Sequence, residues 1–203
     1  MEIAAILKSF IYIVSASLLY PVLFALSLLV LWLLAYCGGF FAEWLQRSKL
    51  GPLQIEAISA FLSKEKIKEA FPHSVAAYFN SLRGIVSKDS PNKDVELENL
   101  LEETTLNFRK SLDSVRMVVR IGPSLGLIGT LIPMGTGLAA LGQGDITKLS
   151  SDMVVAFTTT VVGLAVGIAA YIFYTIKRRW VEKDIKEIHL ITELLTKEAE
   201  KKP

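Results

Sequence analysis

The chain has 203 residues, of which 52% are hydrophobic, and its 22 Lys and Arg nearly balance its 20 Asp and Glu. A mean hydropathy of +0.44 excludes a disordered chain, which combines low hydrophobicity with high net charge. One cysteine and two histidines exclude an internal disulfide framework and leave too few ligands for a Cys/His zinc site, so no metal site is expected.

Three stretches contain no charged residue, and each is long enough to cross a bilayer as a helix. They are residues 9–42, 121–144 and 153–176, whereas about 20 apolar helical residues span the bilayer core. The sequence therefore predicts an all-α membrane protein with transmembrane helices at 9–40, 121–142 and 153–176. The first stretch is too long for the apolar core of a signal peptide, so we expect it to be a retained anchor.

Lys and Arg concentrate on one set of flanks of these spans. That set holds Arg47, Lys49, Arg116, Arg120, Lys177, Arg178, Arg179 and Lys183, against Lys8 and Lys148 on the opposite set. An excess of positive residues marks the cytoplasmic side. We expect a multi-pass protein of the cytoplasmic (inner) membrane with its N-terminus outside and its C-terminus in the cytoplasm. Residues 1–8 and the turn 143–152 are then external, and residues 41–120 and 177–203 are cytoplasmic.

The cytoplasmic segment 41–120 has apolar residues at helical spacing. It predicts helices at Glu56–Ala70 and Ser74–Val86, separated by Pro72, and a polar loop at Ser87–Asp94. The next amphipathic pattern, Val95–Val119, predicts a helix that runs directly into the second span.

The third span has a similar extension. Between Tyr171 and Lys202 there is no glycine or proline, so we expect one helix to continue from the span well into the cytoplasm.

Glycines recur at intervals of three and four residues in the second and third spans. They are Gly122, Gly126 and Gly129 in the second span, and Gly163 and Gly167 in the third. Small residues allow helices in lipid to approach closely. These glycines therefore predict close helix–helix packing, within one subunit or between subunits.

Pro123 and Pro133 interrupt the second span. Proline removes a backbone donor and can kink a membrane helix. Pro123 either begins the span, where proline is tolerated, or acts as a hinge, and we carry both prolines as hinge candidates.

Hydroxyl side chains are the polar groups of the two glycine-rich spans. Thr158, Thr159 and Thr160 are consecutive and point in directions about 100° apart, so at least one faces a neighbouring helix or cavity, and Thr130 lies in the other span. Hydroxyls can coordinate a cation or order water, but they do not titrate. Since these two spans have no charged residue, we expect any titrating group of the path to come from another chain.

Asp152 stands where the third span begins. It is either a helix cap together with Ser150 and Ser151 or an ion-entry residue, and we include it with the four threonines as a candidate of the ion pathway.

The segments GPSLGLIGTLIPMG and MVVAFTTTVVGLAVG resemble the MotA/TolQ/ExbB proton-channel family over about residues 115–180. The layout, with three spans, an external N-terminus and a large inner segment, is similar to the TolQ and ExbB branch. The amino-acid sequence of the third span is more similar to the MotA stator branch.

The resemblance implies a homopentameric ring whose second and third spans line a central pore. The pore of that family encloses the single spans of a partner dimer of the ExbD/TolR/MotB type, and an Asp on the partner binds and releases the ion. The resemblance implies no cofactor besides the transported proton or sodium ion, and no partner other than this dimer, further copies of the chain and membrane lipids. No nucleic acid is expected.

The family's site residues carry over position by position. Thr130 and Thr160 match the pore-facing threonines, Thr159 matches a second threonine of the stator branch, and Pro123 matches the proline at the cytoplasmic end of the pore helix. Val155 departs from the pattern, because TolQ and ExbB have a glutamate there. Asp152, about one turn outward, is the nearest carboxylate.

Two functions are compatible with these features. The first is a pore-forming subunit that converts ion motive force into mechanical work through its single-span partner. The alternative is a non-conducting scaffold that holds a partner complex. An enzyme is not expected, because the chain has no nucleophile–base pairing, phosphate loop or metal spacing. The transported ion and the driven load are not specified by the sequence.

Overall fold

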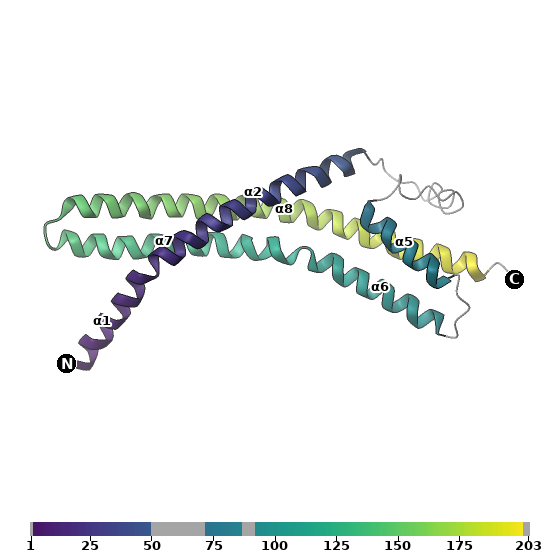
Figure 1. Cartoon of the computed structure of the whole chain (residues 1–203), viewed down its shortest axis with the longest axis horizontal. Coiled ribbons are helices and arrows are strands. Elements are labelled where there is room, and N and C mark those ends of the chain that lie inside the picture. Colours follow the sequence, from purple (N-terminus) through teal and green to yellow (C-terminus); the bar gives the residue numbers. More distant parts are fainter. Residues whose placement is uncertain (1, 50–71, 87–91, 201–203) are drawn as a thin grey trace. The chain divides into compact units, whose positions relative to one another are not determined.

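The computed structural model describes residues 2–49, 72–86 and 92–200, and every regular element within these ranges is a helix. The helices are α1 (Glu2–Ser17), α2 (Leu19–Lys49), α5 (His73–Val86), α6 (Lys93–Lys110), α7 (Asp113–Leu141) and α8 (Ile146–Glu200) (Figure 1). The all-α prediction is confirmed for this part of the chain. The predicted helix at Glu56–Ala70 and residues 87–91 of the predicted loop lie outside the described residues.

Three helical stretches are long and apolar enough to cross a membrane. They are Ser9–Ser48, Lys93–Leu141 and Ile146–Lys197, with mean hydropathies of 2.5, 1.6 and 2.1 in their most apolar windows. This confirms the prediction of three membrane-spanning helices in terms of length and composition.

The first span is divided by a turn, whereas the sequence predicted one continuous helix. The break lies at Leu18, between α1 and α2. Pro21, three residues later, has no N–H to donate to the carbonyl of Ser17, and its ring crowds that carbonyl. The helix resumes when the Val22 N–H donates to the Leu18 oxygen at 3.1 Å.

A second difference concerns the helix predicted at Val95–Val119. The structure interrupts it at Ser111–Leu112, between α6 and α7. The Leu112 N–H bonds the carbonyl three residues back, on Arg109, at 3.0 Å, and the Ser111 hydroxyl donates to the Phe108 carbonyl at 2.7 Å. Such bonds from a serine hydroxyl to a nearby backbone carbonyl compete with the backbone hydrogen bonds of the helix. Hydrophobic periodicity alone does not predict this interruption.

Two further expectations are confirmed. Helix α5 matches the predicted helix at Ser74–Val86 and follows Pro72, whose carbonyl accepts from the N–H groups of Val75 and Ala76. Helix α8 continues without a break from Ile146 to Glu200; the side of the membrane on which it ends stays a prediction.

The chain forms two compact units, which are described separately here. Unit 1 comprises Met1–Gly38 and Ser114–Tyr174, and unit 2 comprises Gly39–Asp113 and Thr175–Pro203.

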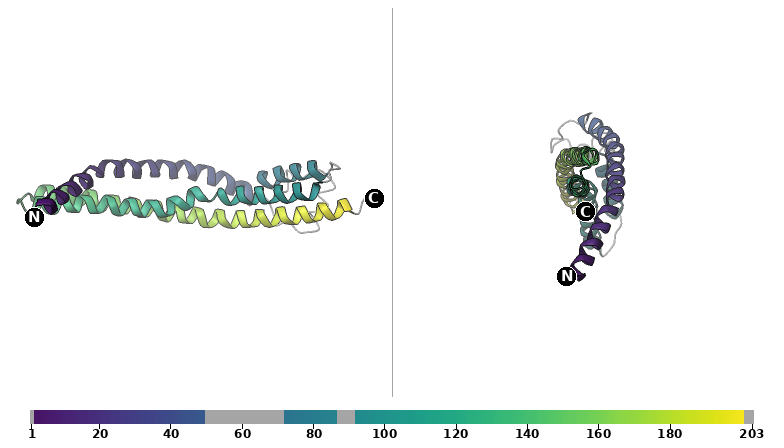
Figure 2. Two further views of the ribbon diagram at one scale, coloured as in Figure 1. Left: turned by 90° about the horizontal axis from the view of Figure 1, so that it is seen from below. Right: turned by 90° about the vertical axis from the view of Figure 1, so that its left-hand side faces the viewer.

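Unit 1 is organised by the contact between α7 and α8, which run side by side in opposite directions (Figures 1 and 2). A Cβ atom built on Gly163 would lie 2.6 Å from the Gly126 Cα, and one built on Gly167 would lie 2.6 Å from the Pro123 Cγ. The two backbones are therefore in direct contact, with no room for a side chain at these points. Beside this contact, Val115, Val118, Val166 and Ala170 form a buried cluster.

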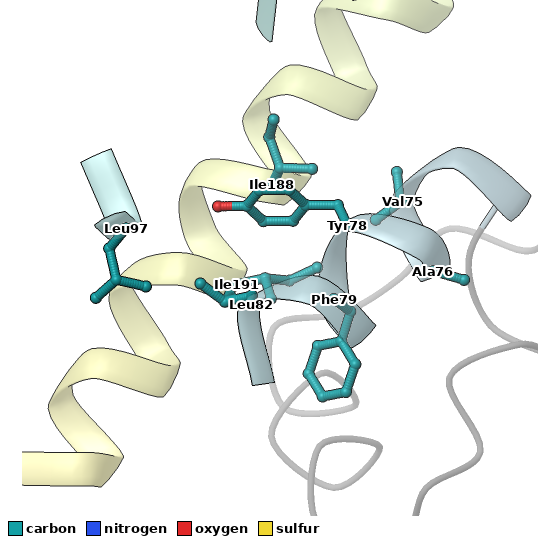
Figure 3. Packing of buried hydrophobic residues seen from close by; sticks show 8 residues of the cluster. All are labelled: Val75, Ala76, Tyr78, Phe79, Leu82, Leu97, Ile188 and Ile191. Atoms are coloured by element: carbon teal, nitrogen blue, oxygen red, sulfur yellow. The ribbon is translucent and has the colours of Figure 1, made fainter. Parts of the chain in front are cut away.

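Unit 2 has its own hydrophobic core, built by three helices (Figure 3). Helix α5 contributes Val75, Ala76, Tyr78, Phe79 and Leu82, helix α6 contributes Leu97, and helix α8 contributes Ile188 and Ile191. The Tyr78 hydroxyl hydrogen-bonds the Thr192 hydroxyl, so the polar tip of this buried ring is satisfied.

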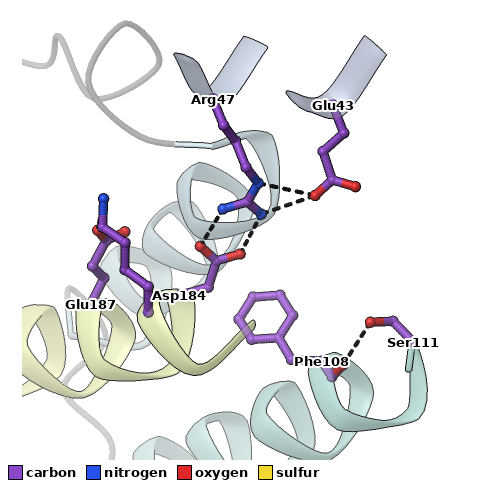
Figure 4. Close-up of polar contacts among 7 residues, drawn as sticks. Glu43, Arg47, Phe108, Ser111, Asp184 and Glu187 are labelled. Carbon is purple, nitrogen blue, oxygen red and sulfur yellow. Dashed lines mark hydrogen bonds and ion pairs between the residues drawn. The ribbon is translucent and has the colours of Figure 1, made fainter. Parts of the chain in front are cut away.

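A buried ion pair joins α2 to α8 within unit 2 (Figure 4). The two terminal guanidinium nitrogens of Arg47 donate to the carboxylate of Asp184, at 2.7 and 2.8 Å, and the Asp184 side chain is 3% exposed. Arg47 also bonds Glu43 and lies 5.1 Å from the ring centroid of Trp180. Removal of either partner would leave a buried charge unpaired, so both side chains are needed for this contact.

We expect Gly163→Ala to destabilise unit 1 by about 1–3 kcal/mol, since its methyl group overlaps the α7 backbone. The matched control is Gly135→Ala on α7, where a Cβ atom meets nothing within 4 Å. The melting temperature of the purified chain in detergent should fall for the first variant only. An equal effect of both substitutions would contradict the close backbone contact.

The Tyr78 phenol provides a test of the unit 2 core. Burial raises the pKa of this phenol above its ordinary value, while the bond to Thr192 acts in the opposite direction. The folded state therefore favours the protonated phenol, and its contribution is lost as the pH rises through the raised pKa.

We accordingly expect Tyr78→Phe to lower stability by about 1 kcal/mol at neutral pH. The difference between wild type and variant should shrink above about pH 10, because the phenol then ionises in the unfolded chain while the buried phenol of the folded state stays protonated. Melting curves from neutral to alkaline pH measure this, with the exposed Tyr20→Phe as the control. A difference that is constant across the pH range would show that the phenol is not buried.

Candidate ion pathway at the contact between α7 and α8

Thr130 and Thr160 lie opposite each other across the helix contact. Their hydroxyls are in hydrogen-bonding contact, and both residues are half-buried. The Thr130 hydroxyl also donates to the Gly126 carbonyl at 2.8 Å, and the Thr160 hydroxyl to the Ala156 carbonyl at 3.1 Å. The structure thus brings together the two threonines that the sequence assigned to different spans.

The hydroxyl pair has more acceptors than hydrogens. Each threonine carries one O–H, but the two carbonyls and the partner hydroxyl offer three places for these hydrogens. Either hydroxyl can therefore turn between its own helix and its partner while its oxygen remains able to accept. Such a group can coordinate a cation or pass a hydrogen bond to water without carrying charge itself.

The other two threonines of the third span differ sharply in environment. Thr159 is 4% exposed, and its hydroxyl donates to the carbonyls of Val155 and Ala156. A Cβ atom on Gly129 would lie 3.0 Å from the Thr159 Cβ, so Thr159 packs against α7. Thr158 is exposed and bonds the Val154 carbonyl at 2.7 Å, on the side away from this contact.

Asp152 does not cap α8. The helix begins at Ile146, and the carboxylate of Asp145 accepts from the Lys148 N–H at 2.9 Å, which is the N-cap bond. The expectation that Asp152 caps the helix with Ser150 and Ser151 is therefore wrong, because the helix begins nearly two turns earlier in the chain. The Asp152 carboxylate instead accepts from the Thr136 hydroxyl of α7 at 2.7 Å.

Thr136 is a site residue that the sequence reasoning missed. Two antiparallel helices joined by a short turn keep one register, so the contact of Thr130 with Thr160 also places residue 136 near residue 152. The sequence could have revealed Thr136 through this register, but only if it were known which threonine of the run 158–160 faces α7.

The two prolines of α7 are accommodated within one continuous helix. The Pro123 ring fills the space left by Gly167, and Pro133 is fully buried. Neither proline ends the helix, and the hinge role of both stays a prediction.

Electrostatically, the contact is neutral along most of its length. No charged residue occurs at 121–144 or 153–176, and no group of His, Cys, Asp or Glu within the described ranges is arranged to hold a metal ion. The arrangement can therefore guide a cation by oxygen ligands, but it contains no proton-binding group between Asp152 and the far end of the spans.

Comparison with known proteins gives a consistent result. The model of the MotA/TolQ/ExbB proton channel family matches residues 63–189, more than half of the chain and well beyond residues 115–180. A protein of Methanothermobacter thermautotrophicus strain Delta H, named as a biopolymer transport protein ExbB homolog, is 28% identical to this chain over 151 residues. The match covers 70% of this chain and 54% of that protein. The chain thus spans about half the length of this relative. No solved structure matches the chain.

The coupling between the two hydroxyls can be measured directly. Thr130→Val and Thr160→Val should each lower the stability by about 0.5–1.5 kcal/mol, because each removes the hydrogen bond between the hydroxyls while the remaining hydroxyl keeps a carbonyl of its own helix. The double variant should cost less than the sum of the two, by at least about 0.5 kcal/mol. Melting curves of the four proteins provide the measurement, and strict additivity would show that the hydroxyls do not interact.

Proposed function

The chain belongs to the MotA/TolQ/ExbB proton channel family, and on that premise we propose that it is the pore-forming subunit of an ion-driven membrane motor. The family is one of channels and transport proteins, not of enzymes. The proposed motor uses proton or sodium motive force and transmits mechanical work through a single-span partner.

The observation that carries this proposal is the pair of facing hydroxyls in spans without charge. Thr130 and Thr160 offer oxygen ligands at mid-span, while the uncharged stretches around them supply no titrating group. A conducting pore of this kind is complete only when another chain adds a carboxylate. Members of the family work with partners of the ExbD/TolR/MotB type, and an Asp on the single span of such a partner meets this need.

We further propose that five copies form a ring around two partner helices. Five identical subunits cannot present the same surroundings to both partner carboxylates at once. Each ion released to the inside then favours a step of the ring around the dimer. One charge crossing 100 mV supplies about 2.3 kcal/mol for such a step.

The proposed setting is the cytoplasmic membrane, with the turn between α7 and α8 outside. The flanks rich in Arg and Lys support this orientation. Segments 41–120 and 177–203 then lie in the cytoplasm.

A non-conducting scaffold is the competing function. It is favoured by the packing of the glycine contact and by the burial of Thr159, which serve helix association whether or not ions pass.

The two functions are separated by Thr130→Val and Thr160→Val, which preserve side-chain shape but remove the hydroxyls. The chain is reconstituted in proteoliposomes with its single-span partner, and ion uptake under a potassium diffusion potential is followed with proton- and sodium-sensitive dyes. We expect uptake to fall about tenfold, the equivalent of one lost hydrogen bond to the passing ion.

The control is Ser27→Ala, because Ser27 on α2 is exposed and bonds only the Leu23 carbonyl of its own helix. It should leave uptake unchanged. Undiminished uptake in both valine variants would reject the pore assignment, and absence of uptake in the wild-type complex would favour the scaffold.

A further inference from the structure

A pocket of about 190 Å³ lies within unit 1, between α1 and the C-terminal part of α7, which leads into the turn to α8. Three hydroxyl-bearing residues line it: Tyr12 and Ser15 from α1, and Thr136 from α7. Both Tyr12 and Ser15 belong to the uncharged stretch 9–42.

The hydroxyls of Tyr12 and Ser15 have no hydrogen-bond partner among the residues that the structure describes, and Tyr12 is more than half exposed. Lipid tails cannot satisfy them, and an unpaired polar group in hydrocarbon is costly. Water can, since the pocket is several times larger than the roughly 30 Å³ that one water occupies. The pocket thus meets both conditions for holding water, which are sufficient room and polar partners.

Thr136 connects this pocket to a carboxylate. Its hydroxyl donates to Asp152 at 2.7 Å, and no Lys or Arg in the described part of the chain forms an ion pair with Asp152. Asp152 is half-buried and is the last charge before the uncharged stretch 153–176. A negative charge next to a hydrated cleft raises the local concentration of cations.

We propose that the pocket is a water-filled entry port that brings a monovalent cation, hydronium or sodium, to Asp152 from the outer side of the membrane. Tyr12 and Ser15 hold the water, and Thr136 orients the carboxylate. The port rests on the proposed function, because it supplies the ions that the hydroxyl pair would pass on. It also gives the missing glutamate of the third span a replacement at Asp152.

The test measures water access and charge selectivity without requiring transport. Cys37 is the chain's single cysteine, so Ser15→Cys is made in a Cys37→Ser background. Membrane-impermeant methanethiosulfonates, one cationic and one anionic, are added to the outside of sealed right-side-out vesicles that contain the full chain. Val14→Cys is the matched control, because Val14 is an exposed apolar neighbour that does not line the pocket.

We expect the cysteine at position 15 to react at least about tenfold faster than the one at position 14, and faster with the cationic than with the anionic reagent. Introducing Asp152→Asn should remove the preference for the cationic reagent while leaving the anionic rate unchanged or higher. Thr136→Val is the second variant, and it should reduce the preference because the carboxylate loses its positioning hydrogen bond.

A lipid-filled pocket would give equal, slow labelling at positions 14 and 15, and this would overturn the port. A charge preference unaffected by Asp152→Asn and Thr136→Val would overturn the role of Asp152. Labelling that occurs only from the inner side would overturn the assigned direction of entry. Thr130 and Thr160 do not line the pocket, so undiminished uptake in Thr130→Val and Thr160→Val with unchanged labelling at position 15 would reject the pore assignment and leave the port standing.

Discussion

The absence of water from the bilayer core is the constraint on which unit 1 depends. Backbone N–H and C=O groups must be paired within the protein, which selects helices, and apolar side chains gain little by leaving lipid for a neighbouring helix. Association must then come from close packing. In this chain it comes from glycines on α7 and α8 whose backbones touch at Gly126 and Gly163.

The same close contact determines where the hydroxyls lie. Once Gly126 meets Gly163, the antiparallel register brings Thr130 to Thr160 and Thr136 to Asp152. The glycines therefore position the polar groups as well as holding the helices together. For the proposed pore, this means that the oxygen ligands are presented by a contact that leaves little freedom for misalignment.

Much of the fold was accessible from the sequence, because uncharged stretches and hydrophobic periodicity are strong signals. The three spans, the helix at 73–86 and the unbroken α8 follow from them. The turns at Leu18 and at Ser111–Leu112 do not, because the first depends on a proline three residues away and the second on a hydrogen bond from the Ser111 hydroxyl to a backbone carbonyl.

The residue types of the candidate site could be predicted from the sequence, but the residues that they contact could not. The roles of Asp145, Asp152 and Thr136 depend on where α8 begins and on its rotation about its own axis, and neither is encoded in local composition.

The backbone contact at Gly163 also restricts how this part of the molecule can move. If α8 advanced by one residue in a screw motion, about 1.5 Å along its axis and 100° about it, the bulkier Val162 or Leu164 would take the place of Gly163, where even a single methyl group does not fit. The α7–α8 hairpin is therefore a preassembled block. Any displacement during a working cycle must be sought at the outer surfaces of this block rather than inside it.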